Sequence, residues 1–432
     1  MVRVVFLHPD LGIGGAERLI VDCSLALQAK GHQTVIITAH HDKTHAFQET
    51  VTGQVEVIAV GDWLPRAIFG RCQAFFATVR MIYITLYMLL TEVADVVIVD
   101  QVSTPLPLLR ATNHPTIFYC HYPDLLLSTD RKSFFKNLYR APMDWLEQST
   151  TGMADTVLVN SKFTMGVFKD TFTRLGHVQP QVLYPSLATH MFEVEGSRPG
   201  SLEGDMITFL SINRFERKKN IGLAIRSFAR LGKMRARLVL AGGYDNRVTE
   251  NVEHFKELVN LAQEHGVLDK IVFLKSPSDQ EKVWLLKNCD CLVYTPAGEH
   301  FGIVPLEGMY CQTPVLAVNS GGPRETVVHG VTGWLCEGDP EQFGEVMRQV
   351  ADNEVEMEKM GTAGKERVEE HFSFEAFTEK LDEYVVDAAI RASEALDGDE
   401  GGTTIFTKFA LAFHFSLAML VLFWMVFYTP LP

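Results

Sequence analysis

The sequence predicts two doubly wound α/β domains joined by a hinge and followed by a membrane anchor. Short, near-continuously apolar runs alternate with helical stretches along residues 1–185 and again along 206–395. Such runs are typical of parallel strands that helices bury on both faces. A stretch rich in glycine, proline, serine and acidic residues separates the two sets at 186–205 and predicts the hinge. A chain of 432 residues is also longer than one hydrophobic core usually serves.

The first domain is Rossmann-like. Its strands are expected at 2–7, 34–38, 55–59, 95–99, 116–120 and 156–159. The second domain is also Rossmann-like. Its strands are expected at 207–212, 237–241, 271–274, 291–294 and 315–318, with a helix over 374–392 returning across the hinge. Ligands bind beyond the carboxyl ends of the strands in such sheets, so we expect the two domains to face a ligand-binding cleft.

The end of the chain changes character. Residues 396–408 form an acidic, glycine-rich linker. Residues 409–428 are twenty predominantly apolar residues without a formal charge if His414 is neutral. As a helix they would span roughly 30 Å, the thickness of a bilayer core, so we expect a membrane anchor. A helix docked on the protein is disfavoured because all its faces are apolar.

Two stretches of the first domain have the composition of membrane contacts. Residues 67–90 form an apolar helix interrupted by Arg71 and Arg80, which favours the membrane interface over a span. A core helix of the domain is the alternative. A second stretch mixes basic and aromatic residues that suit an anionic surface, with a solvated helix as the alternative. Its residues are Arg131, Lys132, Phe134, Phe135 and Lys136.

Composition excludes several classes of function. The net charge of −14 argues against nucleic-acid binding. The seven cysteines have scattered spacings, and the chain has no Asn-x-Ser/Thr sequon, which indicates a reducing compartment. Cys289 and Cys291 lack partners for a zinc site. Asp397 and Asp399 have the Asp-x-Asp spacing that can hold a metal, but they belong to the acidic linker rather than to a strand end and so do not indicate a metal site. We therefore expect no metal and no cofactor.

Three loops after predicted strands carry candidate ligand-binding residues. Gly14 and Gly15 open a helix, where backbone N–H groups can approach a phosphate or a sugar. Glu17 stands where a dinucleotide fingerprint has its third glycine, which argues against a nicotinamide cofactor. Arg214 and Lys219 share one loop and can hold a diphosphate, although an exposed basic run is the alternative.

The third loop runs from residue 296 to 308 and continues into a helix. Its two glutamates, Glu299 and Glu307, are eight residues apart, the first on the loop and the second in the helix. Their carboxylates can therefore reach one ligand from different sides. Glu299 can hold sugar hydroxyls and Glu307 can accept hydrogen bonds from a ribose, while the N–H groups between them face the same point.

These motifs, with Gly242-Gly243-Tyr244-Asp245 and the segment at 319–325, occur in the order of the retaining glycosyltransferase family four, which the chain resembles over about residues 1–390. The resemblance implies the GT-B fold, an acceptor-binding first domain and a nucleotide-sugar-binding second domain. It places Gly14, Gly15 and His121 near the reacting centre. It makes His121, Glu299, Arg214 and Lys219 the catalytic set. The donor-binding set it implies is Gly14, Gly15, Arg214, Lys219, Gly243, Glu299, Phe301, Gly302, Ile303, Val304 and Glu307.

Within that family, residues 8–18, the motif at 119–123 and the anchor resemble the mannosyltransferases of dolichol-linked oligosaccharide assembly. The resemblance implies GDP-mannose as donor and a dolichyl-diphosphate-linked Man-GlcNAc2 acceptor, with an α1,3 and then an α1,6 linkage. It also implies an endoplasmic reticulum membrane, with the active site on the cytosolic face and other assembly transferases as possible partners. Leu125, Leu126 and Leu127 are expected to touch the lipid. A transferase for another donor and lipid, and a non-catalytic sugar-nucleotide-binding subunit, are the alternatives.

Overall fold

The computed structural model describes residues 1–67, 72–127, 134–204, 206–353 and 355–398. It divides into two compact units: unit 1 is Met1–Pro185 with the described residues from Phe377 onward, and unit 2 is Ser186–Ala376. The predicted anchor at 409–428, most of the linker at 396–408, and Arg131 and Lys132 lie outside the described residues.

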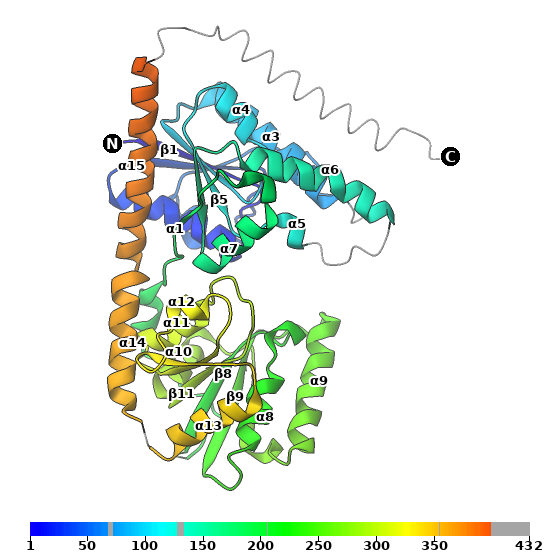
Figure 1. Ribbon diagram of the computed structural model, residues 1–432, viewed down its shortest axis with the longest axis vertical. Coiled ribbons are helices and arrows are strands. Elements are labelled where there is room, and N and C mark those ends of the chain that lie inside the picture. Colours follow the sequence, from blue (N-terminus) through cyan, green and yellow to red (C-terminus); the bar gives the residue numbers. More distant parts are fainter. Residues whose placement is uncertain (68–71, 128–133, 205, 354, 399–432) are drawn as a thin grey trace. The chain divides into compact units, whose positions relative to one another are not determined.

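Unit 1 is built on a seven-stranded parallel sheet in the order β3-β2-β1-β4-β5-β6-β7. The strands are β1 (Arg3–His8), β2 (Gln33–Thr38), β3 (Val57–Ala59), β4 (Val96–Asp100), β5 (Thr116–Cys120), β6 (Thr156–Val159) and β7 (Gln181–Val182). The helices that join them are α1 (Gly15–Ala29), α2 (Gln48–Val51), α3 (Gln73–Thr91), α4 (Leu106–Ala111), α5 (Asp124–Leu127), α6 (Phe134–Thr151) and α7 (Lys162–Thr171). Every residue of β4 and β5 is buried, as expected for central strands covered on both faces (Figure 1).

Unit 2 repeats this plan on a six-stranded parallel sheet in the order β10-β9-β8-β11-β12-β13. The strands are β8 (Ile207–Ile212), β9 (Ala236–Gly242), β10 (Ile271–Lys275), β11 (Cys291–Tyr294), β12 (Val315–Val318) and β13 (Gly333–Cys336). The helices are α8 (Gly222–Ala229), α9 (Thr249–Glu264), α10 (Asp279–Asn288), α11 (Ile303–Tyr310), α12 (Pro323–Thr326), α13 (Pro340–Ala351) and α14 (Met357–His371). Figure 1 shows α8 and α9 on one side of this sheet and α10 to α12 on the other.

Strand order reverses at the centre of each sheet, between β1 and β4 in unit 1 and between β8 and β11 in unit 2. Loops on either side of such a reversal diverge and leave room for a ligand at the carboxyl edge of the sheet. The predicted architecture of two doubly wound parallel sheets is confirmed, and these two switch points are where the candidate residues gather.

The long helix α15 (Phe374–Gly398) begins in unit 2 and joins unit 1 from Phe377 onward. Polar side chains along α15 contact the rest of unit 1. The hydroxyl of Tyr384 donates to the carbonyl of Val182 at 3.3 Å, Asp382 lies 2.7 Å from Nε2 of His32, and Glu379 pairs with Lys30. The return helix was expected to belong to the second domain, whereas most of it lies with the first sheet, because its contacts from Phe377 onward are with unit 1.

Helix α3 covers the first sheet and corresponds to the apolar stretch predicted at 67–90. Among the described residues it is the helix long and apolar enough to cross a membrane. One of its faces joins the hydrophobic core through Met81, Ile84 and Met88. Arg80 is buried, and its Nη2 pairs with Oδ1 of Asp10 at 2.5 Å. These contacts favour the core-helix alternative, and a membrane contact through the exposed Leu90 stays a prediction.

Candidate active site

The loop between β1 and α1 brings the predicted glycines to the carboxyl edge of the first sheet. Gly14 precedes the first residue of α1, and no side chain caps this helix. A Cβ on Gly12 or Gly15 would meet open space, whereas a Cβ on Gly14 would lie 2.2 Å from Oε2 of Glu17. The first N–H groups of α1 are therefore placed to receive a phosphate or sugar oxygen.

His121 follows β5 and contacts a buried carboxylate. Its Nε2 lies 2.7 Å from Oδ1 of Asp100, the last residue of β4, and Oδ2 of Asp100 lies 2.8 Å from Nδ1 of His8, the last residue of β1. His8 and Asp100 are fully buried, while the His121 side chain is 24 % exposed. The sheet order places β1, β4 and β5 side by side, which brings the three residues together.

The charge of Asp100 is fixed by its two histidine neighbours. Burial on its own would raise the pKa of this carboxyl. The charges and hydrogen bonds of His121 and His8 outweigh that effect, and the net result is a lowered pKa. Asp100 is therefore an ionised, buried carboxylate at neutral pH. Sequence reasoning missed Asp100 and His8 as site residues; the available signal was a polar residue ending each of two apolar strands.

The leucines predicted to touch lipid lie on α5, directly after the His121 loop. Leu126 and Leu127 are exposed, by 38 % and 59 %, while Leu125 contacts the core of unit 1. The carboxylate of Glu147, on α6, accepts the backbone N–H groups of Asp124 at 2.7 Å and Leu125 at 3.0 Å. Burial and the neighbouring charge of Asp124 raise the pKa of Glu147 to about 7. A titratable group therefore helps to hold the helix that carries the leucines, together with Arg140, whose Nη2 donates to Oδ2 of Asp124 at 2.9 Å.

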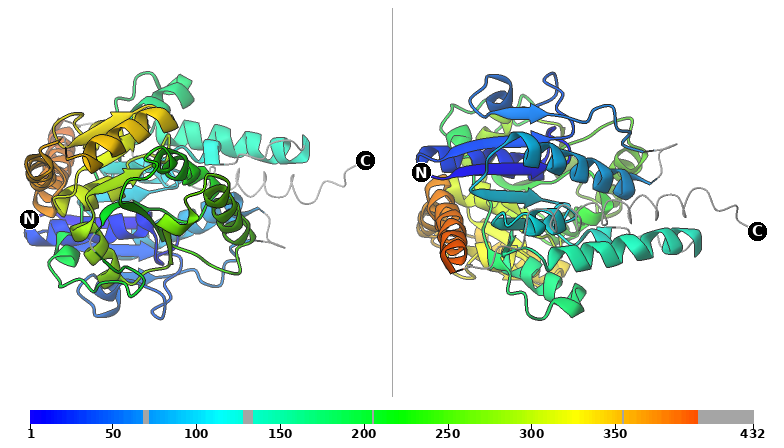
Figure 2. Two further views of the ribbon diagram at one scale, coloured as in Figure 1. Left: turned by 90° about the horizontal axis from the view of Figure 1, so that it is seen from below. Right: turned by 90° about the horizontal axis from the view of Figure 1, so that it is seen from above.

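The predicted basic and aromatic stretch leads into the N-terminal end of α6, which projects away from the rest of unit 1 (Figure 2). The backbone of Phe134, Phe135 and Lys136 forms the first turn of this helix, and their side chains lie outside the description. Contact of this stretch with a membrane stays a prediction.

In unit 2, the loop after β8 carries Arg214 and Lys219. The Nζ of Lys219 pairs with Oε1 of Glu299, and these side chains are 13 % and 27 % exposed. The hydroxyl of Thr295 donates to the carbonyl of Lys219 at 2.7 Å, which ties this loop to the end of β11. Arg214 is more exposed and pairs with Glu216 at 3.0 Å. Two of the predicted residues, eighty positions apart, are thus brought into contact.

Glu307, on α11, is the most buried of the predicted acidic residues, with 7 % of its surface exposed. Its Oε1 lies 2.7 Å from Nζ of Lys282 on α10. Its Oε2 is buried without a hydrogen-bond partner among the described residues. A buried oxygen of this kind is suited to accept hydroxyl groups of a bound ligand. Lys282 was missed by the sequence analysis, because no motif connects it to Glu307.

Glycines allow the loops of unit 2 to approach closely around this carboxylate. Gly302 has a φ of +79° and precedes the first residue of α11. The N–H of Gly322 donates to the carbonyl of Glu299 at 2.8 Å, and a Cβ on Gly322 would lie 2.0 Å from the carbonyl oxygen of Phe301. The segment Phe301, Gly302, Ile303 and Val304 is therefore fixed by the loop after β12. A Cβ on Gly243 would lie 3.3 Å from Cγ of Arg214, so this glycine lines the Arg214 loop.

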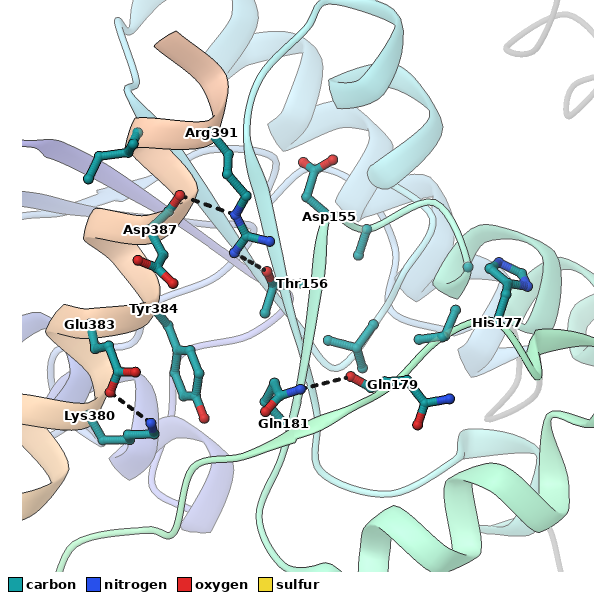
Figure 3. A pocket seen from close by; sticks show the side chains of 15 residues that line it. Asp155, Thr156, His177, Gln179, Gln181, Lys380, Glu383, Tyr384, Asp387 and Arg391 are labelled. Carbon is teal, nitrogen blue, oxygen red and sulfur yellow. Dashed lines mark hydrogen bonds and ion pairs between the residues drawn. The ribbon is translucent and has the colours of Figure 1, made fainter. Parts of the chain in front are cut away.

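A cavity of about 750 Å³ lies elsewhere in unit 1, between α15 and the beginnings of β6 and β7 (Figure 3). Asp155, His177, Lys380 and Arg391 line it. Its charged groups are largely satisfied within the protein: the guanidinium of Arg391 donates to Thr156, and Lys380 donates to Glu383. This cavity is at the amino edge of the sheet, opposite the edge that carries His121. No group of three or more potential metal-binding side chains occurs in the part of the chain that the structure describes.

Known proteins resemble this chain over both units. Residues 13–178 match the family described as Glycosyltransferase Family 4, and residues 196–367 match Glycosyl transferases group 1. Alpha-1,3/1,6-mannosyltransferase ALG2 of Homo sapiens is 51 % identical over 398 residues, covering 88 % of this chain and 95 % of the relative. The enzyme of the same name from Saccharomyces cerevisiae is 42 % identical, covering 88 % of this chain and 84 % of the relative.

Solved structures share the fold. A sucrose-phosphate synthase from Thermosynechococcus elongatus superimposes with a TM-score of 0.70 at 18 % identity, covering 90 % of this chain and 99 % of the other. Anabaena HepE, solved in complex with UDP and glucose, gives a TM-score of 0.64 at 18 % identity and covers 90 % of this chain and all of its own. At these identities the likeness supports the two-domain glycosyltransferase fold alone.

Proposed function

The chain belongs to the family of α-1,3/1,6-mannosyltransferases, and from this premise we propose that it transfers mannose from GDP-mannose to a dolichyl-diphosphate-linked Man-GlcNAc2 acceptor. It makes an α1,3 and then an α1,6 linkage. The identity over most of the chain disfavours both alternatives, a transferase for another donor and a non-catalytic subunit.

The observation that carries the proposal is the pair of lysine-held carboxylates at the carboxyl edge of the second sheet. Lys219 contacts Glu299, and Lys282 contacts Glu307. Glu307 keeps a buried, unpartnered Oε2 for the ribose hydroxyls of the donor. Glu299 and the N–H groups of residues 301–304 hold the donor mannose. The arrangement supplies acceptors for hydroxyl groups and donors for phosphate oxygens within one unit.

The cations on the Arg214 loop act on the departing GDP. Arg214 and Lys219 contact the diphosphate, whose negative charge grows as the glycosidic bond breaks, so they stabilise the transition state more than the ground state. These two side chains balance the negative charge of the diphosphate, so the reaction needs no metal ion for that purpose. The anomeric configuration is retained by attack on the face that the GDP leaves, with a phosphate oxygen taking the proton of the acceptor hydroxyl.

Unit 1 supplies the acceptor side. His121, Gly14 and Gly15 contact the reacting sugar from the carboxyl edge of the first sheet. Leu126 and Leu127, exposed on α5, contact the lipid of the acceptor. The residues at 409–428 anchor the chain in the endoplasmic reticulum membrane, with the active site on the cytosolic face, where other transferases of the assembly are candidate partners.

The test is a donor panel. The purified, detergent-held chain is incubated with Man-GlcNAc2 lipid and GDP-mannose, UDP-glucose or UDP-N-acetylglucosamine, and products are read by mass. We expect two hexose additions from GDP-mannose alone. Glu299→Ala should abolish both additions, because it removes the sugar-binding carboxylate and the partner of Lys219.

Glu341→Ala is the matched control, since this glutamate is exposed on unit 2 and pairs with Arg230 on the surface. It should leave both additions intact. Transfer from UDP-glucose instead of GDP-mannose would contradict the donor assignment, and full activity of Glu299→Ala would contradict the role of that carboxylate.

A further inference from the structure

We propose that Asp100 is a positioning residue for His121: it holds the hydrogen of the imidazole on Nε2 and leaves Nδ1 for the substrate. His8, buried behind Asp100, holds the carboxylate in place. The effect on turnover rests on the proposed function, whereas the placement of the hydrogens follows from unit 1 alone.

Both ring nitrogens of His8 face hydrogen-bond acceptors. Its Nδ1 lies 2.8 Å from the Asp100 carboxylate, and its Nε2 lies 3.1 Å from the backbone carbonyl of Asp10. A carbonyl oxygen cannot donate, and an ionised carboxylate cannot either. Both nitrogens of His8 therefore carry hydrogen, and its ring is an imidazolium. It is paired with Asp100 where neither side chain is exposed to solvent.

The hydrogen of the His121 ring lies on Nε2. Oδ1 of Asp100 is an acceptor, so the His121 Nε2 at 2.7 Å must be the donor. In a neutral imidazole the other nitrogen, Nδ1, is then an acceptor. The backbone of His121 is held as well, because Nδ2 of Asn160 donates to its carbonyl at 3.1 Å. The ring lies against Tyr119, with centroids 4.7 Å apart.

The charge of His8 balances the charge of Asp100. A charge on His121 adds to the lowering of the Asp100 pKa, but the imidazolium of His8 can balance the carboxylate by itself when His121 is neutral. A neutral His121 with a fixed tautomer can accept a hydrogen bond at Nδ1 from a substrate hydroxyl. Without the carboxylate, the hydrogen could equally sit on Nδ1, which would then donate to that hydroxyl instead of accepting from it.

Asp100→Asn is the informative variant. Its amide can donate to Nε2 of His121 and so favours the opposite tautomer at nearly unchanged volume. We expect kcat for mannose transfer to fall by roughly 10- to 100-fold, with KM for GDP-mannose changed by less than about threefold. In the His121→Ala background, Asp100→Asn should lower kcat no further, because its effect passes through the imidazole.

Asp155→Asn is the matched control. Asp155 is a carboxylate of the same sheet that accepts the N–H of Thr116 at 2.8 Å, at the opposite edge from His121. It should leave kcat unchanged. If the losses from Asp100→Asn and His121→Ala multiply in the double variant, or if Asp100→Asn leaves kcat within twofold, Asp100 is a structural residue and the proposal fails.

A spectroscopic measurement on the unsubstituted chain decides the hydrogen placement even if Asp100→Asn does not fold. Long-range ¹H–¹⁵N spectra of the ¹⁵N-histidine-labelled full chain, with His121→Gln and His8→Gln for assignment, report which nitrogens carry hydrogen. We expect an Nε2-H tautomer for His121 and an imidazolium for His8 at pH 7. An Nδ1-H tautomer for His121 would overturn the proposal. Absence of transfer from every donor would contradict the proposed function. It would not affect the hydrogen placement, which the NMR spectra test independently of activity.

Discussion

Glu307 shows how a binding carboxylate can be kept available inside a folded unit. Lys282 satisfies Oε1 at 2.7 Å, while Oε2 is buried without a partner among the described residues. An unsatisfied buried oxygen costs about 1–3 kcal/mol, which a ligand hydroxyl recovers when it binds. The lysine therefore orients the carboxylate, and in the proposed function the free oxygen accepts a hydroxyl group of the donor.

Lys282→Met tests this arrangement. Removing the ammonium leaves Glu307 as a mostly buried charge without its cation, so we expect stability to fall by about 1–3 kcal/mol. KM for GDP-mannose should rise by roughly tenfold, the effect of about 1.4 kcal/mol. Chemical denaturation and initial rates measure the two effects. Lys287→Met, on the same helix but exposed, is the control, and an equal loss in both variants would contradict the role of Lys282.

Glu147 makes a pH dependence testable. Its pKa is raised from 4.5 to about 7 by burial and by Asp124, against the backbone hydrogen bonds and the charge of Arg140. The folded state therefore holds a proton that the unfolded state has lost between pH 4.5 and 7, and stability falls as pH rises through this window. At about 1.4 kcal/mol per pKa unit, the rise from 4.5 to about 7 sets a ceiling of about 3.5 kcal/mol on the loss of stability at pH 8.

Glu147→Gln removes this titration. We expect the variant to gain stability relative to the natural chain as pH rises from 5 to 8, because the glutamine carries no charge to desolvate. Denaturant unfolding at both pH values measures the difference. A difference between the two proteins that is the same at pH 5 and pH 8 would show that Glu147 does not titrate in this range.

Candidate residues that share one local motif could be predicted from the sequence. Residues that meet only through strand order or helix packing could not. Glu299 and Glu307 stand in one motif, and Arg214 and Lys219 in another, so local patterns together with the family resemblance could identify them as candidates. Asp100 and His8 are ninety-two positions apart and meet only because β1 and β4 are adjacent. Lys282 reaches Glu307 from another helix. Their selection depends on strand order and helix packing, which no local pattern contains.

At the scale of elements, glycines determine how closely the loops of the donor site approach. Gly322 has an ordinary φ, so its role is not backbone conformation. A side chain there would collide with the backbone of Phe301, at 2.0 Å from the oxygen and 2.4 Å from the carbonyl carbon. The loop after β12 therefore sets the position of the N–H groups that open α11.

Gly322→Ala should displace that loop. We expect kcat/KM for GDP-mannose to fall by more than tenfold and stability by about 1–3 kcal/mol, because backbone rather than a flexible side chain must move. Gly338→Ala is the control, since its Cβ would lie 3.8 Å from Cγ1 of Val318. Thermal unfolding and initial rates compare the two. Unchanged kinetics in Gly322→Ala would show that these N–H groups do not position the donor.

Elements were predictable where burial leaves a strong pattern. The central strands are almost entirely apolar, and their positions were predicted to within a few residues. The edge strands β7 and β13 were missed, since β7 has two residues, one of them glutamine, and β13 begins with glycine. The sequence could not assign α3 to the core or to the membrane, because an apolar helix with an arginine occurs in both settings. The ion pair between the buried Arg80 and Asp10 in the structure favours the core.

At the scale of the whole molecule, each unit has a sheet and a hydrophobic core of its own. Each also has candidate residues at its own switch point, and the proposed function assigns donor binding to those of unit 2 and acceptor binding to those of unit 1. A mannosyltransferase needs both sets, so neither sheet alone accounts for the activity. The net charge of −14 adds a constraint on membrane attachment, because anionic lipids repel an acidic protein.

Membrane attachment should therefore depend on apolar residues rather than on charge. We expect the full chain to stay in the membrane pellet in 1 M salt and in alkaline carbonate, because the twenty predominantly apolar residues at 409–428 are long enough to span a bilayer. A chain ending at residue 398 should be released by carbonate and still transfer mannose in detergent, since the described site residues all precede that position. Immunoblotting of pellet and supernatant measures the distribution. If the shortened chain stays in the carbonate pellet, the anchor lies in the first 398 residues, and Ser replacement of Leu126 and Leu127 would then ask whether α5 contributes.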